Sequence, residues 1–152
     1  MTQRMHVHLT VTDLAASAAF YERLFGRAPE LARPDMVKWL LDDPALNFAI
    51  SAGSNAGVSH LGLELDSNDA LQTLSATADP DDAGVSETRA QCCYAVSDKH
   101  WLQDPDAISW ELFHTLSRDG DDDNESQAAG AEAEAAPRMM PSYPGNGMGG
   151  CC

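Results

Sequence analysis

The sequence predicts an α+β fold: two tandem βαβββ modules that form a cupped mixed sheet around a metal cleft, followed by a disordered C-terminal tail. Three observations lead to this prediction. A period-two hydrophobic alternation recurs after 54 residues, each alternating segment runs into an amphipathic helix, and short strand-like segments follow each helix. Composition changes after Leu116, which sets the predicted domain at 1–116 and the acidic, then Gly/Met/Cys-rich, tail at 117–152.

The two alternating segments, HVHLTV at 6–11 and HLGLEL at 60–65, each begin with a histidine. Successive side chains of a strand point to opposite faces, so each segment has one aliphatic face and one face that carries a histidine, His6 or His60. His8 shares the face of His6. The aliphatic faces are the ones that we expect to be buried in a core.

A helix is expected after each alternating segment. The first, in TDLAASAAFYERLFG, has Thr12 or Asp13 as its N-cap, an apolar stripe, and Gly26 at its end. Ser67 can cap the second helix, in SNDALQTLSATAD, whose stripe is weaker. Short strands should follow both helices, namely VKWLL (37–41), NFAIS (47–51), ETRAQCCYAV (87–96), HWLQD (100–104) and ISWELF (108–113).

Charge excludes several classes of partner. The chain carries a formal net charge of −15, and residues 1–116 alone carry −10, because the tail holds seven acids and two arginines. Such an acidic surface repels nucleic acids and anionic lipids, so we expect neither nucleic acid nor a membrane as a partner. The chain has no apolar run long enough to span a bilayer and no signal-peptide pattern, which predicts a cytoplasmic location.

Three expected strands carry a metal-binding side chain on the face opposite their aliphatic row. These side chains are His6, His60 and, in ISWELF, Glu111. If the two modules curl toward each other, the three faces meet in a cleft. Two imidazoles and one carboxylate form the facial set typical of non-haem Fe(II), with open positions for O2 or substrate. The same set also accepts Mn, Co, Ni or Zn, and His8 could take the place of His6.

The four cysteines form two adjacent pairs, Cys92–Cys93 and Cys151–Cys152. In a reducing compartment such pairs indicate metal binding or catalysis rather than disulfides. Thiolates select soft acceptors, and two adjacent cysteines can bind one soft atom if the local backbone bends.

Over roughly residues 4–115 the chain resembles the vicinal oxygen chelate superfamily, which includes glyoxalase I, extradiol dioxygenases and bleomycin-binding proteins. The resemblance rests on HVHLTVTDLAASAAFYERLFG, SHLGLEL and DPDAISWELF, and it implies metal ligands at His6, His60 and Glu111. Two features depart from the superfamily. NFAIS offers no carboxylate as the fourth ligand of glyoxalase-type sites, which favours an oxygenase. Ala107 stands where the superfamily usually has Gly, in a turn that often needs a positive φ.

The stretches KWLLDDPALNFAIS, QCCYAVSDKHW and DPDAISWELFHTL resemble one branch of the superfamily, the organoarsenical carbon–arsenic lyases and cadmium-induced proteins. This resemblance implies a non-haem Fe(II)-dependent dioxygenase that converts trivalent organoarsenicals, such as methylarsenite and trivalent aromatic arsenicals, to arsenite with O2 as co-substrate. It further implies that Cys92 and Cys93 bind arsenic. Lys99, which follows the pair, is expected in a mobile loop that closes over the site, with a catalytic role.

Two other functions stay open on the sequence. A protein that sequesters arsenic or cadmium without chemistry would use both cysteine pairs and consume no O2. Another superfamily enzyme, such as a glyoxalase or a ring-cleaving dioxygenase, would not need Cys92 and Cys93 at all. The distal pair, Cys151 and Cys152, could scavenge metal or deliver arsenic to the cleft, and the domain could form a homodimer.

Overall fold

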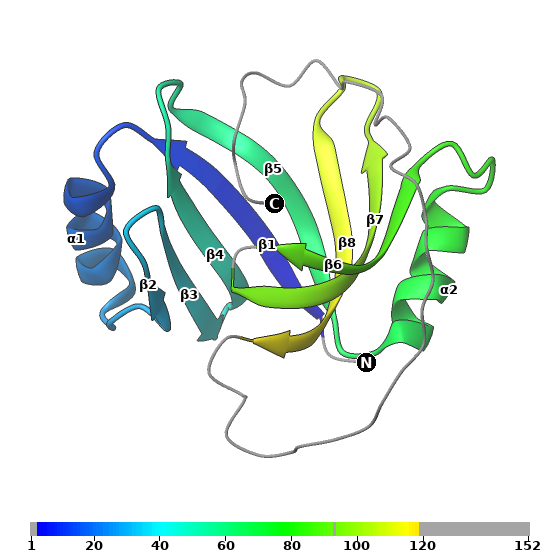
Figure 1. Cartoon of the computed structure of the whole chain (residues 1–152), viewed down its shortest axis with the longest axis horizontal. Coiled ribbons are helices and arrows are strands. Elements are labelled where there is room, and N and C mark those ends of the chain that lie inside the picture. The colour runs from blue at the N-terminus through cyan, green and yellow to red at the C-terminus, as the bar shows by residue number, and fades with distance from the viewer. Residues whose placement is uncertain (1–2, 93, 119–152) are drawn as a thin grey trace.

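The computed structural model describes residues 3–92 and 94–118, apart from the side chain of Cys92, and contains one mixed sheet and two helices (Figure 1). The first half consists of β1 (Gln3–Val11), α1 (Leu14–Phe25), β2 (Leu31–Ala32), β3 (Met36–Asp42) and β4 (Ala45–Ala52). The second half consists of β5 (Gly57–Leu65), α2 (Asn68–Ala78), β6 (Val85–Cys92), β7 (Ala95–Gln103) and β8 (Ser109–Arg118).

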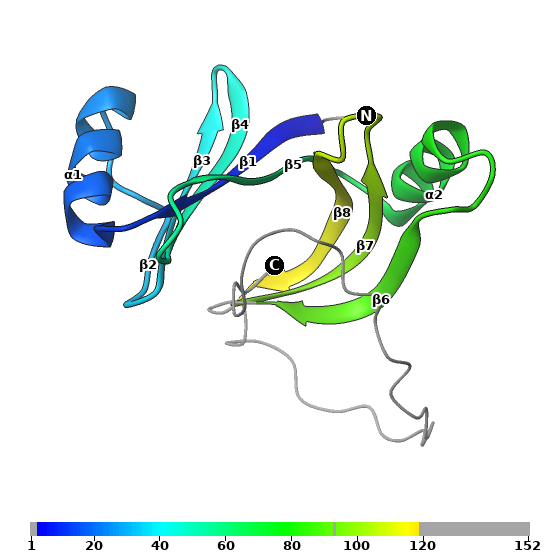
Figure 2. The ribbon, with the colours of Figure 1, turned by 90° about the horizontal axis from the view of Figure 1, so that it is seen from above.

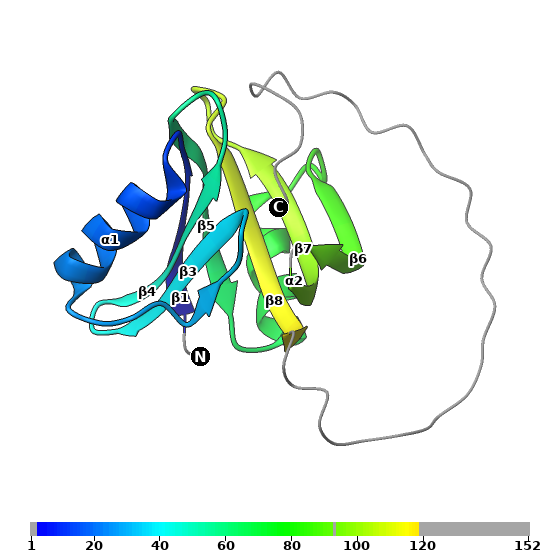
Figure 3. The same ribbon diagram turned by 60° about the vertical axis from the view of Figure 1, so that its left-hand side comes forward.

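The sheet confirms the predicted pair of βαβββ modules. Its eight strands run in the order β2-β3-β4-β1-β5-β8-β7-β6, so each module contributes four neighbouring strands in the same internal arrangement (Figure 3). β1 pairs with β4 in parallel, β5 pairs with β8 in parallel, and β1 and β5 join the modules as antiparallel neighbours. The sheet is bent, with α1 outside one half and α2 outside the other (Figure 2).

Both helices begin as the sequence predicts. Asp13 caps α1 and accepts a hydrogen bond from the backbone N–H of Ala16 (2.9 Å), and Ser67 caps α2 in the same way. Gly26 ends α1 in the left-handed conformation, with φ of 67°. These caps fix where each helix leaves the sheet, and hence which stripe of the helix faces it.

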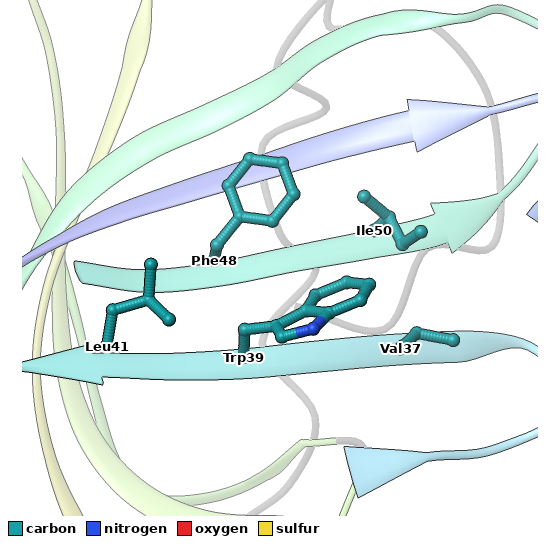
Figure 4. Packing of buried hydrophobic residues seen from close by; sticks show 5 residues of the cluster. All are labelled: Val37, Trp39, Leu41, Phe48 and Ile50. Carbon is teal, nitrogen blue, oxygen red and sulfur yellow. The ribbon is translucent and has the colours of Figure 1, made fainter. Parts of the chain in front are cut away.

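Each module has its own apolar core on the helix-covered side of the sheet. Under α1, side chains of β3 and β4 point to the same side and pack with the apolar stripe of the helix; they are Val37, Trp39, Leu41, Phe48 and Ile50 (Figure 4). Under α2 the cluster consists of Leu65, Ala70, Leu71 and Leu112. Because side chains alternate along a strand, the residues that precede and follow each of these strand residues face the opposite, concave side.

The predicted strand at 87–96 is wrong, because the chain turns within it. β6 ends at Cys92 and β7 begins at Ala95, and these two residues pair in an antiparallel hairpin. Tyr94 lies in the turn, with φ of 71°. No Gly, Asn or Asp marks this turn in the sequence, and the β-forming residues around it favour an uninterrupted strand.

The hairpin also corrects the expectation for Lys99. This residue lies in the middle of β7, paired with Phe113 of β8, and not in a mobile loop. In the first module the two-residue strand β2 was not expected, because it is too short to show alternation.

β8 continues to Arg118, two residues beyond the predicted boundary at Leu116. The rest of the predicted tail, with Cys151 and Cys152, lies outside the described residues. Among the described residues, no helix is long and apolar enough to cross a membrane.

Candidate metal centre

Polar side chains are buried on the concave side of the sheet, where they line a small pocket with a cavity volume of about 50 Å³. Strands β1, β3 and β4 of the first module and β7 and β8 of the second module contribute to it. The lining residues are His6, His8, Met36, Lys38, Ala49, Ala95, Ser97, Lys99, Glu111, Phe113 and Thr115. Most of its lining side chains are polar or ionisable, which suits a metal ion with small polar ligands.

The three predicted metal ligands meet in this region, although they lie up to 105 residues apart in the chain. The Nε2 atoms of His6 and His60 are 3.2 Å apart. Oε2 of Glu111 lies 3.6 Å from Nε2 of His6 and 3.3 Å from Nε2 of His60. All three residues are at most 5% exposed.

The spacing of these three atoms fits a first-row transition metal. Ligand atoms held about 2.0–2.2 Å from one metal, at angles between square and tetrahedral, lie about 2.8–3.6 Å from one another. The observed distances of 3.2, 3.3 and 3.6 Å fall in this range. Two imidazoles and one carboxylate on one side of a metal leave its other positions free.

Backbone contacts orient His6 for this role. Its Nδ1 donates a hydrogen bond to the carbonyl oxygen of Asn47 (3.0 Å), and a carbonyl can only accept. The proton is therefore on Nδ1, and the lone pair of Nε2 points to His60 and Glu111. Burial lowers the pKa of His6 to about 4, so the ring is neutral at pH 7 and able to bind a cation.

Glu111 is ionised in spite of its burial. Desolvation alone would raise its pKa, but the hydrogen bond from His60 and the positive charge of Lys99 lower the pKa to about 2. The ammonium of Lys99 lies 2.7 Å from Oε1, which leaves Oε2 directed at the two histidines. The two oxygens of one carboxylate thus serve two different partners.

His8 is the nearest competitor as a ligand. Ring nitrogens of His6, His8 and His60 all lie within 4.8 Å of one another among the described residues. Nε2 of His8 bonds with the hydroxyl of Ser51 at 2.6 Å, and burial lowers its pKa to about 3. Geometry therefore admits both residue sets, and the choice between His6 and His8 stays a prediction.

Gly62 brings the two halves of the centre together. It is paired with Glu111 on the neighbouring strand, and a Cβ atom on Gly62 would collide with the carbonyl oxygen of Glu111. Only a residue without a side chain lets β5 and β8 approach this closely. The alternating segment at 60–65 thus needs its glycine.

The internal symmetry locates the position that a fourth ligand would have. Gly62 pairs with Glu111 in the second module, and the equivalent pair in the first module is His8 with Ala49. Ala49 is the counterpart of Glu111, and its methyl group cannot bind a metal. Among the described residues, the first module therefore offers no carboxylate at this position.

Cys92 ends β6, in the hairpin that borders the pocket. Cys92 pairs with Ala95, and Ala95 lines the pocket. The turn is anchored to the other module, because the hydroxyl of Tyr94 donates to Asp35 (3.1 Å) and the guanidinium of Arg33 lies 4.9 Å from its ring. The side chain of Cys92, and Cys93 as a whole, lie outside the described part of the structure.

Sequence reasoning missed several residues around the centre. Asn47 is fully buried. Its side-chain amide donates a hydrogen bond to Glu64 (2.9 Å), and its backbone carbonyl oxygen accepts one from His6. Lys38 lines the pocket from β3. The sequence pattern that could have identified them is a polar residue on the second face of an otherwise apolar strand, as in VKWLL and NFAIS. A single polar residue in such a strand is too common to identify a site.

Several curated proteins are similar to this chain in sequence. A trivalent organoarsenical cleaving enzyme of Bacillus sp. (strain MD1) is 36% identical over 117 residues, which cover 72% of this chain and 71% of that protein. The enzyme of the same name from Thermomonospora curvata is 34% identical over 116 residues, covering 72% and 76%. Cadmium-induced protein CadI of Mycobacterium bovis is 30% identical over 119 residues, covering 75% and 77%. No family model matches the chain.

Solved structures similar to the chain include ring-cleaving dioxygenases. The 2,3-dioxygenase LapB from Pseudomonas sp. KL28 matches with a TM-score of 0.61 and 16% identity, over 80% of this chain and 44% of that chain. An extradiol ring-cleaving dioxygenase from B. fuscum matches with a TM-score of 0.58 and 16% identity, over 76% of this chain and 33% of that one. This chain thus spans less than half of either dioxygenase, and at this identity the likeness shows the fold alone.

Proposed function

Because the chain belongs to the family of trivalent organoarsenical cleaving enzymes and cadmium-induced proteins, we propose that it is an Fe(II)-dependent dioxygenase-type carbon–arsenic lyase. Its substrates would be trivalent organoarsenicals, methylarsenite and trivalent aromatic arsenicals among them, and its arsenic product would be arsenite. The observation that carries the proposal is the convergence of His6, His60 and Glu111 beside a pocket that His6, Glu111 and Ala95 of the β6–β7 hairpin line.

His6, His60 and Glu111 would hold the iron, and His8 would remain hydrogen-bonded to Ser51. The bound Fe(II) would supply open coordination positions for O2 and the redox chemistry of the reaction. Support comes from the 3.2–3.6 Å spacing of the three donor atoms and from the neutral state of His6. The lack of a carboxylate at Ala49 favours three protein ligands over four.

Cys92 and Cys93 would bind the arsenic atom of the substrate. Trivalent arsenic prefers sulfur ligands, and two thiolates would fix the carbon–arsenic bond beside the metal. Two adjacent cysteines can both bind one arsenic atom if the local backbone bends, and β6 ends in a turn directly after Cys92. The contacts of Tyr94 with the other module would keep this hairpin at the pocket.

Lys99 would act as the catalytic cation of the site. Its ammonium is 2.7 Å from Oε1 of Glu111, and the residue is only 4% exposed. It would keep Glu111 ionised and could donate a proton to an oxygen of the substrate in the same pocket. This role replaces the gating loop that the sequence suggested.

Cys92→Ser tests the proposal, because it removes one sulfur ligand without altering the metal ligands. In the Fe(II)-loaded wild type, O2 uptake should rise when phenylarsenite is added. In Cys92→Ser we expect at least a tenfold lower uptake rate with an unchanged iron content. Full activity in this variant would reject the arsenic-binding role of the pair.

A second candidate is sequestration of arsenic or cadmium without chemistry, since some relatives are named for their induction by cadmium. The same experiment separates the two functions. Sequestration predicts tight, thiol-dependent binding of Cd(II) or phenylarsenite and no O2 uptake in any variant.

A further inference from the structure

A chain of hydrogen bonds joins Asp79, His100 and Ser86 in the second module. Nε2 of His100 lies 3.0 Å from Oδ2 of Asp79, and Nδ1 of His100 lies 2.8 Å from the hydroxyl oxygen of Ser86. Ser86 of β6 and His100 of β7 are paired directly across the hairpin, so their side chains share one face of the sheet. Asp79 ends α2, which places this face on the side of that helix.

These three residues are separate from the candidate metal centre. The neighbours of His100 in β7 serve that centre: Lys99 lies 2.7 Å from Glu111, and the ring centroids of Trp101 and His60 are 5.1 Å apart. Because side chains alternate along a strand, His100 faces the opposite side of the sheet. The proposed lyase function therefore does not use this group.

The hydrogen bonds fix where the proton of His100 lies. Oδ1 of Asp79 accepts the backbone N–H of Ala83 (3.0 Å), and Oδ2 accepts that of Gly84 (2.8 Å). The bonds from Gly84 and Ala83 lower the pKa of Asp79, so the carboxylate is ionised and can only accept. The proton of His100 is therefore on Nε2, and its Nδ1 accepts the hydroxyl proton of Ser86.

Gly84 makes room for the contact between Asp79 and His100. A Cβ atom at this position would lie 2.8 Å from both Oδ2 of Asp79 and Nε2 of His100, and it would collide with the carbonyl oxygen of Trp101. The loop after α2 thus needs a residue without a side chain where the carboxylate meets the imidazole.

The two ends of the chain of hydrogen bonds differ in exposure. His100 is 5% exposed, whereas Ser86 lies open on the surface. An accessible hydroxyl that is bonded to a neutral imidazole, which a carboxylate orients in turn, is the arrangement of an activated serine nucleophile. The ring is reversed relative to the usual triad, with Nδ1 toward the serine, and the path of the proton is the same.

β6 also offers donors for an oxyanion. It is the last strand of the described sheet, so backbone N–H groups on its outer side are not bonded to another described strand. Such groups beside Ser86 are available to bind the negative oxygen that forms when a carbonyl is attacked.

We propose that Ser86 is a nucleophile for acyl transfer from activated esters, such as aryl esters, with His100 as its general base and Asp79 as a positioning residue. The hydroxyl oxygen of Ser86 attacks the ester carbonyl while its proton passes to Nδ1 of His100. The alcohol leaves with that proton. Water then releases the acyl group as a carboxylic acid by the same route, so the reaction needs no oxidant or reductant.

The test measures the release of p-nitrophenolate from p-nitrophenyl acetate by the full-length protein, after its thiols have been blocked with N-ethylmaleimide. Ser86→Ala and His100→Gln should each lower the rate at least about tenfold, since a general base typically contributes about 10²–10⁴-fold. Ser54→Ala is the matched control and should keep the wild-type rate, because Ser54 is an exposed serine between β4 and β5.

Nitrogen NMR of the His100 ring separates positioning by Asp79 from a merely structural role. The wild type should carry the proton on Nε2. Asp79→Asn should slow the release of p-nitrophenolate and shift the proton toward Nδ1, because the carboxylate that holds it is lost. A slower reaction without a change of tautomer would overturn the positioning role.

A wild-type rate no higher than that of Ser86→Ala would overturn the nucleophile. A proton on Nδ1 of His100 in the wild type would overturn the general base, and this measurement needs no variant to fold. Neither result bears on the lyase proposal, since the metal centre lies on the other side of the sheet.

Discussion

Glu111 links every part of the proposed centre, because one oxygen contacts Lys99 and the other faces His6 and His60. We expect Glu111→Gln to weaken Fe(II) binding at least about 100-fold, since an amide replaces the single negative ligand. His8→Gln, in contrast, should keep a normal iron content. Both are measured by metal analysis after anaerobic reconstitution.

A buried lysine without its carboxylate destabilises a fold, so Glu111→Gln needs a control. The double variant Glu111→Gln/Lys99→Met removes both charges and should fold while still failing to bind iron. Loss of iron in His8→Gln, with iron retained in His6→Gln, would instead assign the ligand role to His8.

Gly62 is the second residue on which the geometry depends, because a Cβ atom there meets the backbone of Glu111. Gly62→Ala should lower the free energy of unfolding by about 1–3 kcal/mol, the usual cost of overpacking. It should also weaken iron binding, since β8 must shift. Urea unfolding of the metal-free protein measures the first effect, and unchanged stability would contradict the close approach of β5 and β8.

At the residue level the sequence predicted the convergence of His6, His60 and Glu111, because alternation assigns each to a face and the repeat brings the faces together. It did not predict Asn47 or Lys38. Their positions depend on which strands become neighbours, and the strand order cannot be predicted from the sequence of any single segment.

Two hairpins show how far the sequence predicts individual elements. The turn between β7 and β8 follows local rules: Oδ1 of Asp104 accepts hydrogen bonds from the backbone N–H groups of Asp106 and Ile108, both at 2.9 Å. The turn between β6 and β7 lacks such residues, and Tyr94 takes a positive φ there. Contacts with Arg33 and Asp35 in the other module stabilise this turn, and a local pattern cannot reveal them.

Ala107 has a positive φ of 63°. We expected this because the superfamily usually has a glycine at this position. Left-handed backbone costs a non-glycine residue about 1–2 kcal/mol, whereas the added flexibility of glycine in the unfolded chain costs about 0.4–1 kcal/mol. Ala107→Gly should therefore stabilise the protein by roughly 0.5 kcal/mol. The measurement is the urea midpoint.

Ala56→Gly is a matched control, because Ala56 is also exposed but is not among the residues with positive φ. It should give no gain in stability. A destabilising effect of Ala107→Gly would show that the turn is not strained.

In the whole molecule, the two sides of the sheet formed by the duplicated module have different roles. The helix-covered side holds two apolar cores, and the concave side holds buried ionisable groups. The repeat made this architecture predictable, apart from the two-residue strand β2. The buried groups in turn make stability depend on pH.

His6 and His8 have pKa values lowered by burial from 6.5 to about 4 and about 3. Protons therefore bind more tightly to the unfolded chain than to the folded protein. The free energy of unfolding keeps its full value above pH 6.5 and decreases as the pH falls toward these pKa values. The loss is on the order of 3 kcal/mol for His6 and 5 kcal/mol for His8. The lowered pKa of Glu111, from 4.5 to about 2, adds a further loss below pH 4.5.

Urea unfolding of the metal-free protein between pH 7 and pH 4 measures this dependence. We expect a steep fall in the free energy of unfolding, and a smaller fall above pH 4.5 in His8→Gln, which has one titrating ring fewer. A flat profile in the wild type would mean that these rings are not buried in the neutral form.

We propose that this protein cleaves a carbon–arsenic bond with iron and O2 in the pocket between its two modules. Arsenic speciation after a single turnover is the decisive measurement. The protein is reconstituted with Fe(II) without O2, mixed with methylarsenite, and then exposed to O2. We predict arsenite only when both iron and O2 are present. Methylarsenite that stays bound and unchanged would contradict the lyase and favour sequestration.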